Sequence, residues 1–230
     1  VLVEPRRFEV RDVELPELAP AQVRVRLEGC GVCASNLAPW EGRPWFEYPF
    51  PPGSPGHEGW GVVQAVGEDV RGVGEGERVT LLGEHAFASH ADVDATKIVP
   101  LPAALAGRPF PGKPLACAFN VLARCGIEPG QRVAIVGIGF MGAVLTALCR
   151  RAGAEVIAIS RRRSSLKEAE RMGARASVLM DDHARVIDRV DELTRGALCD
   201  VVIECAGAQW PLDLASAITR VRGRLVIAGD

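Results

Sequence analysis

The second half of the chain alternates strand-like apolar runs with helix-like segments, and this alternation restricts the possible folds more than any other feature. Apolar residues with helical spacing separate the runs. Parallel strands connected by helices form a sheet that is covered on both faces. We therefore predict an α/β domain with a doubly wound parallel sheet. Its predicted strands are 132–137, 155–160, 176–180, 200–207 and 224–229.

The first of these strands runs into VGIGFMG, which places Gly137, Gly139 and Gly142 in the pattern G-x-G-x-x-G. The pattern follows a strand and opens a helix, which is the context of a dinucleotide-binding loop. Gly137 permits a tight turn, Gly139 lets backbone amides approach a pyrophosphate, and Gly142 lets the helix pack on the strand. The helix N-terminus, with Phe140 and Met141, then faces the phosphates. The alternative is a glycine-rich turn that binds nothing.

The end of the second predicted strand is where the cofactor ribose is recognised in such a fold. An acidic residue there would accept a hydrogen bond from the 2′-hydroxyl of NAD and would repel a 2′-phosphate. This chain has Ser160, followed by three arginines at 161–163. Because a hydroxyl and a guanidinium can hold a phosphate, we predict that Ser160 and Arg161 favour NADP(H) over NAD(H). Alternatively, the arginines form a solvated helix start.

The first half of the chain has the pattern of short β-strands between glycine and proline turns. VRVRLEG (23–29) alternates apolar and charged residues, as a half-buried strand does. The runs 59–70 and 76–83 are similar and are bounded by glycine. These features predict a β domain that precedes the α/β domain.

The change between the two patterns falls in a segment rich in proline and glycine, 105–114. We predict a β domain at 1–112 and a dinucleotide-binding domain at 113–230. A helix should begin near the end of this segment. Its spacing predicts one buried side made by Leu115, Phe119, Leu122 and Cys125.

Composition narrows the classes of function. The chain has 230 residues and a formal net charge of −2, so it lacks the basic surplus typical of proteins that bind nucleic acid or anionic membranes. We find no apolar run long enough to span a bilayer and no signal peptide at the amino end. Seven scattered cysteines in a chain of this size indicate a reduced, cytoplasmic setting.

Three side chains of the first half could hold a metal ion. Cys33 lies in GCGVCASN, and His57 and Glu58 lie together in PGHEGWG. A thiolate, an imidazole and a carboxylate suit Zn²⁺, with a fourth position left open. Such an ion would polarise a substrate oxygen for hydride transfer, and Ser35 could pass the proton. Cys30 and Cys33 also form C-x-x-C, so a redox pair and two structural thiols are alternatives.

Four segments together resemble the medium-chain dehydrogenase/reductase family, which contains the zinc-dependent alcohol and polyol dehydrogenases. The resemblance implies a GroES-like β-barrel domain, then a Rossmann domain, with the active site in the cleft. It also implies that Cys33, His57 and Glu58 are zinc-site residues and that Ser35 belongs to the proton relay. The four segments are GCGVCASN (29–36), PGHEGWGVV (55–63), GERV (76–79) and VAIVGIGFMG (133–142).

The resemblance further implies an oxidoreductase with a small alcohol or carbonyl substrate and a homo-oligomeric full-length form. The four-cysteine lobe that holds a structural zinc in many members is missing, so we expect one catalytic zinc and no structural zinc. The family continues beyond the last predicted strand, so we also expect this chain to be truncated at its C-terminus.

This chain departs from the family pattern at several positions near the expected zinc. Asn36 stands where an acid usually orients the zinc-bound histidine, and we expect Asn36 to accept that hydrogen bond without the charge. Ala38 stands where many members end the proton relay with a histidine. Lys113 replaces a glutamate common in polyol-type members, and Cys117 is a possible substitute ligand.

These departures keep two other functions open. The first is a zinc-free NADPH-dependent reductase of the same fold, in which binding geometry alone orients the hydride transfer. The second is a non-catalytic dinucleotide-binding protein. We prefer a zinc-dependent oxidoreductase that transfers hydride between NADP(H) and an alcohol or carbonyl compound.

Overall fold

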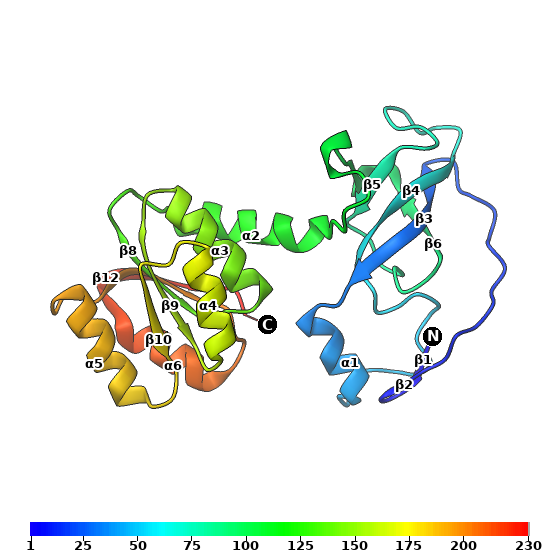
Figure 1. The fold of residues 1–230 in the computed structure, drawn as a ribbon. Coiled ribbons are helices and arrows are strands. Elements are labelled where there is room, and N and C mark those ends of the chain that lie inside the picture. Colours follow the sequence, from blue (N-terminus) through cyan, green and yellow to red (C-terminus); the bar gives the residue numbers. More distant parts are fainter. Residues whose placement is uncertain (230) are drawn as a thin grey trace. The chain divides into compact units, whose positions relative to one another are not determined.

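The structure is a computed structural model that describes residues 1–229. The chain divides into two compact units, one from Val1 to Pro114 and the other from Leu115 onward (Figure 1). The division that we expected after residue 112 lies two residues before the observed one. Each unit has its own sheet and its own apolar core.

The first unit contains a five-stranded antiparallel sheet. In the order in which they lie side by side, the strands are β6 (His90–Asp94), β3 (Gln22–Gly31), β4 (Glu58–Val66), β5 (Arg78–Leu81) and β7 (Ile98–Pro100). The expected alternation holds in β3, where Val23 and Val25 are fully buried while Arg24 and Arg26 are not. These valines pack with those of β4, β5 and β6 into the core of the unit.

Short elements flank this sheet. A 3-10 helix leads directly into a short α-helix, which ends at Gly42 because Gly42 adopts the left-handed conformation (φ 83°) that favours glycine. A separate two-stranded sheet lies at the amino end. The elements are β1 (Leu2–Glu4), β2 (Arg7–Phe8), η1 (Ala34–Asn36), α1 (Leu37–Glu41), η2 (Ala95–Lys97) and η3 (Ala103–Leu105).

The second unit contains a five-stranded sheet in which all strands run parallel. Side by side, they are β10 (Ala176–Leu179), β9 (Glu155–Ser160), β8 (Arg132–Val136), β11 (Cys199–Glu204) and β12 (Thr219–Ile227). The chain moves outward from β8 through β9 to β10, and then continues on the other side of β8. Ligands of doubly wound sheets bind at the point where the strand order reverses, which here lies between β8 and β11.

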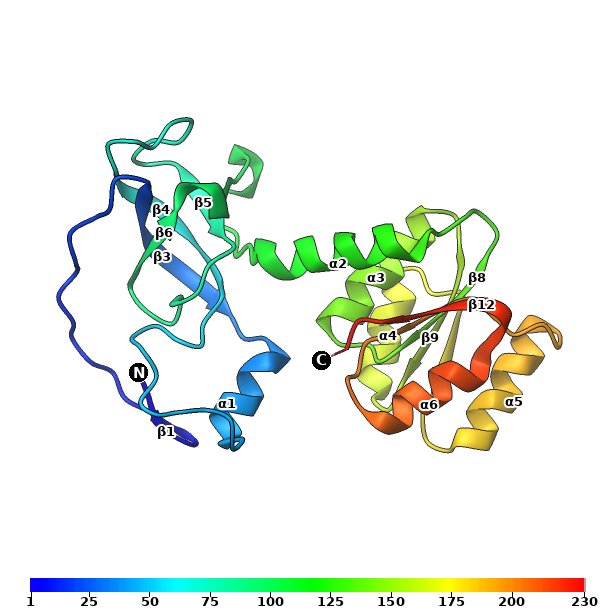
Figure 2. The ribbon, with the colours of Figure 1, turned by 180° about the vertical axis from the view of Figure 1, so that it is seen from behind.

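Helices cover both faces of this sheet, as Figures 1 and 2 show. They are α2 (Gly112–Cys125), α3 (Phe140–Arg151), α4 (Arg163–Arg171), α5 (His183–Thr194) and α6 (Gln209–Ile218). Successive residues of β8 point to opposite faces. Val133 and Ile135 pack against α2, α3 and α4, whereas Ala134 and Val136 pack against α5 and α6. This double burial explains why the strands are apolar throughout.

Two details differ from the sequence-based expectation. Phe119 of α2 is 57% exposed, whereas Ala118 and Cys125 are fully buried. Because those two residues are seven positions apart, they lie almost directly in line along the helix, and Phe119 lies about a quarter turn away. The last strand is also longer than expected, since β12 begins at Thr219. Within residues 1–229, no helix has the length and apolar character needed to cross a membrane.

Candidate functional site

The antiparallel pairing of β3 and β4 brings the expected metal ligands together. The last residue of β3, Gly31, pairs with the first residue of β4, Glu58. Cys33 follows β3 by two residues and is the residue before η1, and His57 immediately precedes β4. Segments more than twenty residues apart in the sequence therefore meet at one end of this strand pair.

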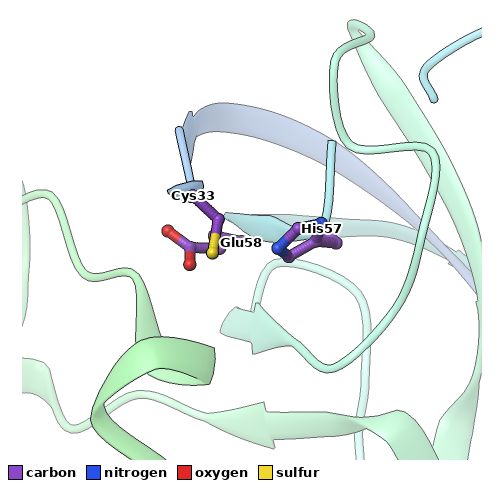
Figure 3. Close-up of side chains that lie close together, drawn as sticks. All are labelled: Cys33, His57 and Glu58. Atoms are coloured by element: carbon purple, nitrogen blue, oxygen red, sulfur yellow. The ribbon is translucent and has the colours of Figure 1, made fainter. Parts of the chain in front are cut away.

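The three side chains lie close together (Figure 3). The Cys33 sulfur, a His57 ring nitrogen and a Glu58 carboxylate oxygen all lie within 4.8 Å of one another. Ligand atoms around a tetrahedral zinc ion are about 3.3–3.8 Å apart, given bond lengths of 2.0–2.3 Å. Small movements that bring these ligand atoms closer together would therefore let them enclose such an ion.

The ring of His57 is arranged as a metal ligand requires. Its Nδ1 lies 3.0 Å from the carbonyl oxygen of Pro55, and a carbonyl only accepts hydrogen bonds, so Nδ1 carries the proton. Nε2 is then left with a free lone pair. Nε2 is buried and has no hydrogen-bond partner among the described residues. Because buried polar atoms are rarely left unpaired, this nitrogen fits a site for a cation.

The Glu58 carboxylate is seated against a glycine. Glu58 is only 6% exposed, and a Cβ atom on Gly31 would overlap its Oε2. The absence of a side chain at Gly31 therefore leaves the room that the carboxylate occupies. A buried carboxylate needs a charge partner or hydrogen bonds, and a cation between Glu58, Cys33 and His57 would supply the charge.

The expected hydrogen bond from His57 to Asn36 is wrong. Asn36 is buried at the end of η1, and its Nδ2, not its oxygen, faces Nδ1 of His57 at 3.5 Å. The Pro55 carbonyl accepts from the ring instead. The amide is turned this way because its Oδ1 accepts from the backbone N–H of Cys33, at 2.9 Å.

Two other residues of this segment have different environments. Ser35, the expected proton relay, lies on η1 and is exposed. Cys30 and Cys33 are both free thiols rather than a disulfide. Burial raises the pKa of the Cys30 thiol, and this effect outweighs hydrogen bonds from the backbone of Glu58 and His57. Cys30 thus has less thiolate character than an ordinary cysteine, which disfavours the redox alternative.

The glycine loop of the second unit has the three properties predicted from its sequence. Gly137 has a φ of 98°, which allows the tight turn at the end of β8. A Cβ atom on Gly142 would overlap the carbonyl oxygen of Gly137, whereas a Cβ atom on Gly139 would meet nothing within 4 Å. Gly139 therefore faces open space at the N-terminus of α3, where no side chain caps the helix.

An open groove of about 500 Å³ lies beside this loop. Its lining includes Gly139, Phe140 and Arg162, together with Ser164 and Ser165 of α4. A groove that combines an uncapped helix start, hydroxyl groups and a guanidinium is suited to phosphate groups. Neither serine was predicted to belong to this site, although their position directly after the three arginines was a usable signal.

The residues expected to recognise the cofactor ribose differ in exposure. Ser160 is only 4% exposed, and its Oγ accepts a hydrogen bond from the backbone N–H of Arg162 at 3.3 Å. Arg161, Arg162 and Arg163 are all exposed. Ser160 thus holds the turn at the end of β9, while the arginine side chains are available to a ligand.

A buried acid shapes the loop that follows β11. Glu204, at the end of β11, is 1% exposed, and its carboxylate accepts from the backbone N–H groups of Ala206 and Gly207. The turn held in this way is in contact with the glycine loop, because a Cβ atom on Gly137 would lie 2.9 Å from the nitrogen of Ala206. An acid at the end of the apolar run VVIE was the available signal.

Sequence models of two known families match this chain. The model described as the alcohol dehydrogenase GroES-like domain matches residues 19–103, within the first unit. The model described as zinc-binding dehydrogenase matches residues 129–229, within the second unit. The expected order of a GroES-like domain followed by a Rossmann-like parallel sheet is therefore confirmed.

Individual relatives resemble the chain over most of its length. An alcohol dehydrogenase of Rhizobium meliloti (strain 1021) is 28% identical, over 96% of this chain and 73% of that protein. A sorbitol dehydrogenase of Halalkalibacterium halodurans is 30% identical over the same shares. A crystal structure described as a zinc-binding dehydrogenase from Sinorhizobium meliloti 1021, bound to NADP, has a TM-score of 0.82 and 29% identity. That similarity covers 99% of this chain and 75% of the other.

Proposed function

This chain belongs to the medium-chain, zinc-containing alcohol dehydrogenase family, and from this premise we propose that it transfers hydride between NADP(H) and a small alcohol or carbonyl compound. The observation that carries the proposal is the buried, unpaired Nε2 of His57 beside the Cys33 sulfur and the Glu58 carboxylate. These three residues would hold the zinc ion. When bound, zinc would supply Lewis acidity toward the substrate oxygen.

The other steps rest on residues of this chain. In the zinc site, the thiolate of Cys33 and the carboxylate of Glu58 would bring negative charge that offsets the charge of the ion, and Nε2 of His57 would offer it a lone pair. Ser35, exposed two residues after Cys33, would pass the alcohol proton toward water. Ala38 offers no further proton acceptor, so the relay ends at the hydroxyl or at solvent.

The cofactor would be held mainly by backbone groups. Gly137, Gly139 and Gly142 leave room for a pyrophosphate at the N-terminus of α3, where Phe140 and Met141 contribute backbone amides. The exposed guanidinium of Arg161, with Ser160 holding the turn behind it, would favour a 2′-phosphate. The related structure bound to NADP supports this preference.

The proposal is tested by metal content and by cofactor-dependent turnover of the purified protein. We expect about one equivalent of zinc per chain, because three protein ligands with an open fourth position hold a single catalytic ion. Removing the zinc with a chelator should abolish oxidation of alcohols, and adding it back should restore the rate. Full turnover by protein that contains no metal would instead support the zinc-free reductase. Cofactor binding without turnover of any alcohol, aldehyde or ketone would support a non-catalytic role.

The cofactor preference is tested separately. Arg161→Ala should weaken binding of NADPH about 10- to 100-fold and leave NADH almost unchanged, because one charge-assisted hydrogen bond contributes about 1.5–3 kcal/mol. Arg171→Ala is the matched control, since Arg171 is an exposed arginine at the other end of α4. Fluorescence titration with both cofactors measures the ratio. An unchanged ratio in Arg161→Ala would remove the assignment of NADP(H) to this residue.

A further inference from the structure

Asn36 connects the two loops that carry the candidate metal ligands. Asn36 is only 6% exposed. Oδ1 accepts from the backbone N–H of Cys33 at 2.9 Å, and Nδ2 donates to the carbonyl oxygen of Pro55 at 2.7 Å. One loop contains Cys33 and the other contains His57, so a single buried amide ties the backbone of both.

The orientation of this amide is set by its two partners. The Cys33 N–H can only donate and the Pro55 carbonyl can only accept. Turning the amide over would place Nδ2 against a donor and Oδ1 against an acceptor, and both hydrogen bonds would be lost. The Nδ2 group of Asn36 therefore faces His57, and it has no lone pair to offer to the ring.

The Pro55 carbonyl, in consequence, receives two donors. Asn36 Nδ2 approaches it at 2.7 Å and His57 Nδ1 at 3.0 Å, which matches the two lone pairs of a carbonyl oxygen. The bond from Asn36 holds the carbonyl in the position where it fixes the proton on Nδ1. The free lone pair of His57 is then on Nε2, which is buried and has no hydrogen-bond partner among the described residues. The His57 side chain lies close to those of Cys33 and Glu58 (Figure 3).

We propose that Asn36 is a positioning residue that acts on His57 through the Pro55 carbonyl, as a clasp between the Cys33 loop and the His57 loop. The clasp rests on the proposed function, because it orients a ligand of the proposed zinc site. It differs from direct acceptance of the histidine proton by residue 36, because in the clasp the donor group of the amide is the essential part. The two arrangements make opposite predictions for the substitution Asn36→Asp.

The metal affinity of Asn36→Asp is the decisive measurement. The carboxylate retains an acceptor for the Cys33 N–H, but it replaces the donor at Pro55 with a second acceptor, which repels the carbonyl. The clasp predicts that Co²⁺ and Zn²⁺ bind about tenfold more weakly than to the unsubstituted protein. Direct acceptance from His57 predicts the reverse, since a carboxylate partner makes the imidazole a better ligand. Binding to Asn36→Asp that equals or exceeds the original affinity would therefore overturn the clasp.

Asn36→Ala removes both hydrogen bonds and should weaken Co²⁺ binding by about 10- to 100-fold. The absorption bands of bound Co²⁺ report ligand geometry, so we expect them to shift in this variant, which a purely structural role of Asn36 would not require. Asn120→Ala is the control, because Asn120 is the other asparagine of the chain and lies exposed on α2 in the second unit. Unchanged Co²⁺ affinity and spectrum in Asn36→Ala would contradict the proposal.

The tautomer of His57 tests the clasp without metal. The ¹⁵N chemical shifts of the ring in metal-free protein at pH 8 should show the proton on Nδ1, and the chain has only four histidines to assign. A mixture of tautomers is expected in Asn36→Ala. A proton found on Nε2 in the unsubstituted protein would overturn the clasp. If the protein binds neither Co²⁺ nor Zn²⁺, the proposed function fails, and the tautomer measurement still decides the role of Asn36.

Discussion

The two units build their candidate sites from different parts of the polypeptide. In the second unit, the glycine loop offers backbone amides, a helix start and the space left by missing side chains. In the first unit, the candidate metal site would depend on three side chains and, by our proposal, on a buried amide and a carbonyl that orient one of them. One contiguous motif can specify a site made of backbone groups, because the geometry of such a site follows from local conformation. A side-chain site depends on the register of strands that are distant in sequence.

The largest effect is expected from Cys33→Ser, which changes only the candidate metal site of the first unit. Loss of a thiolate ligand should release the zinc and lower kcat/KM by about 10³-fold or more, since the metal contributes several kcal/mol to stabilisation of the transition state. Binding of NADPH to the second unit should change less than about twofold, close to the error of a titration. Metal analysis, kinetics and fluorescence titration measure the three quantities. Retained zinc with retained activity would remove Cys33 from the site.

Two glycine substitutions separate the roles of the backbone in the cofactor loop. Gly139→Ala places a methyl group in open space that the pyrophosphate would need. We expect it to weaken cofactor binding by about 10- to 100-fold, equivalent to about 1.4–2.7 kcal/mol, without loss of stability. Gly142→Ala would overlap the Gly137 carbonyl and should lower the free energy of unfolding by about 1–3 kcal/mol. Urea unfolding and cofactor titration distinguish them, and equal stability losses would contradict the assignment.

A smaller change at the metal site is expected from Gly31→Ala. The added methyl group would displace the Glu58 carboxylate, whose far end is flexible enough to move. We expect zinc affinity to fall about tenfold, within the range typical for disturbed metal ligation, while the stability of the metal-free protein changes by less than about 1 kcal/mol. Gly72→Ala is unsuitable as a control because its φ is positive. Ala34→Gly, which removes a methyl group from an exposed residue of η1, serves instead and should leave zinc affinity unchanged.

The smallest effect concerns how the stability of the second unit depends on pH. Asp200 is partly buried, which by itself raises its pKa. Hydrogen bonds from the Arg132 backbone and from Arg220, with the charge of Arg132, outweigh burial and hold the pKa of Asp200 below its ordinary value of 3.8. Asp200 therefore stabilises the fold above about pH 4, and this contribution is lost as the pH falls through the lower, folded-state pKa.

Replacing this carboxylate should remove that pH dependence. Asp200→Asn is expected to lower the free energy of unfolding by about 1 kcal/mol at pH 7. The difference from the unsubstituted protein should shrink as the pH is lowered toward about 3. Urea titrations at several pH values, followed by a probe in the second unit, measure it. A difference that grows toward low pH would show that the pKa of Asp200 is raised in the folded state rather than lowered.

Most of the second unit was predictable, because the signals are local. Its five strands follow from apolar periodicity, and the predicted strand at 155–160 coincides with β9. The roles of Gly137 and Gly142 follow from the spacing of the motif and match the contacts found at each position. Phe119 was wrongly predicted to be buried, because helical spacing alone does not say which of two neighbouring rows of residues along α2 faces the sheet. Ala118, although smaller, lies on the buried one.

The sequence by itself determined the class of fold, the glycine loop and the residue types of the candidate metal ligands, since each depends on neighbours along the chain. Only the tertiary structure decided how the ligands are oriented. The register of Gly31 with Glu58, the contact between them, and the amide of Asn36 between Cys33 and Pro55 all join segments that are distant along the chain. The partners of a buried polar group are fixed when the loops pack, because only then is water excluded and each donor left to find an acceptor.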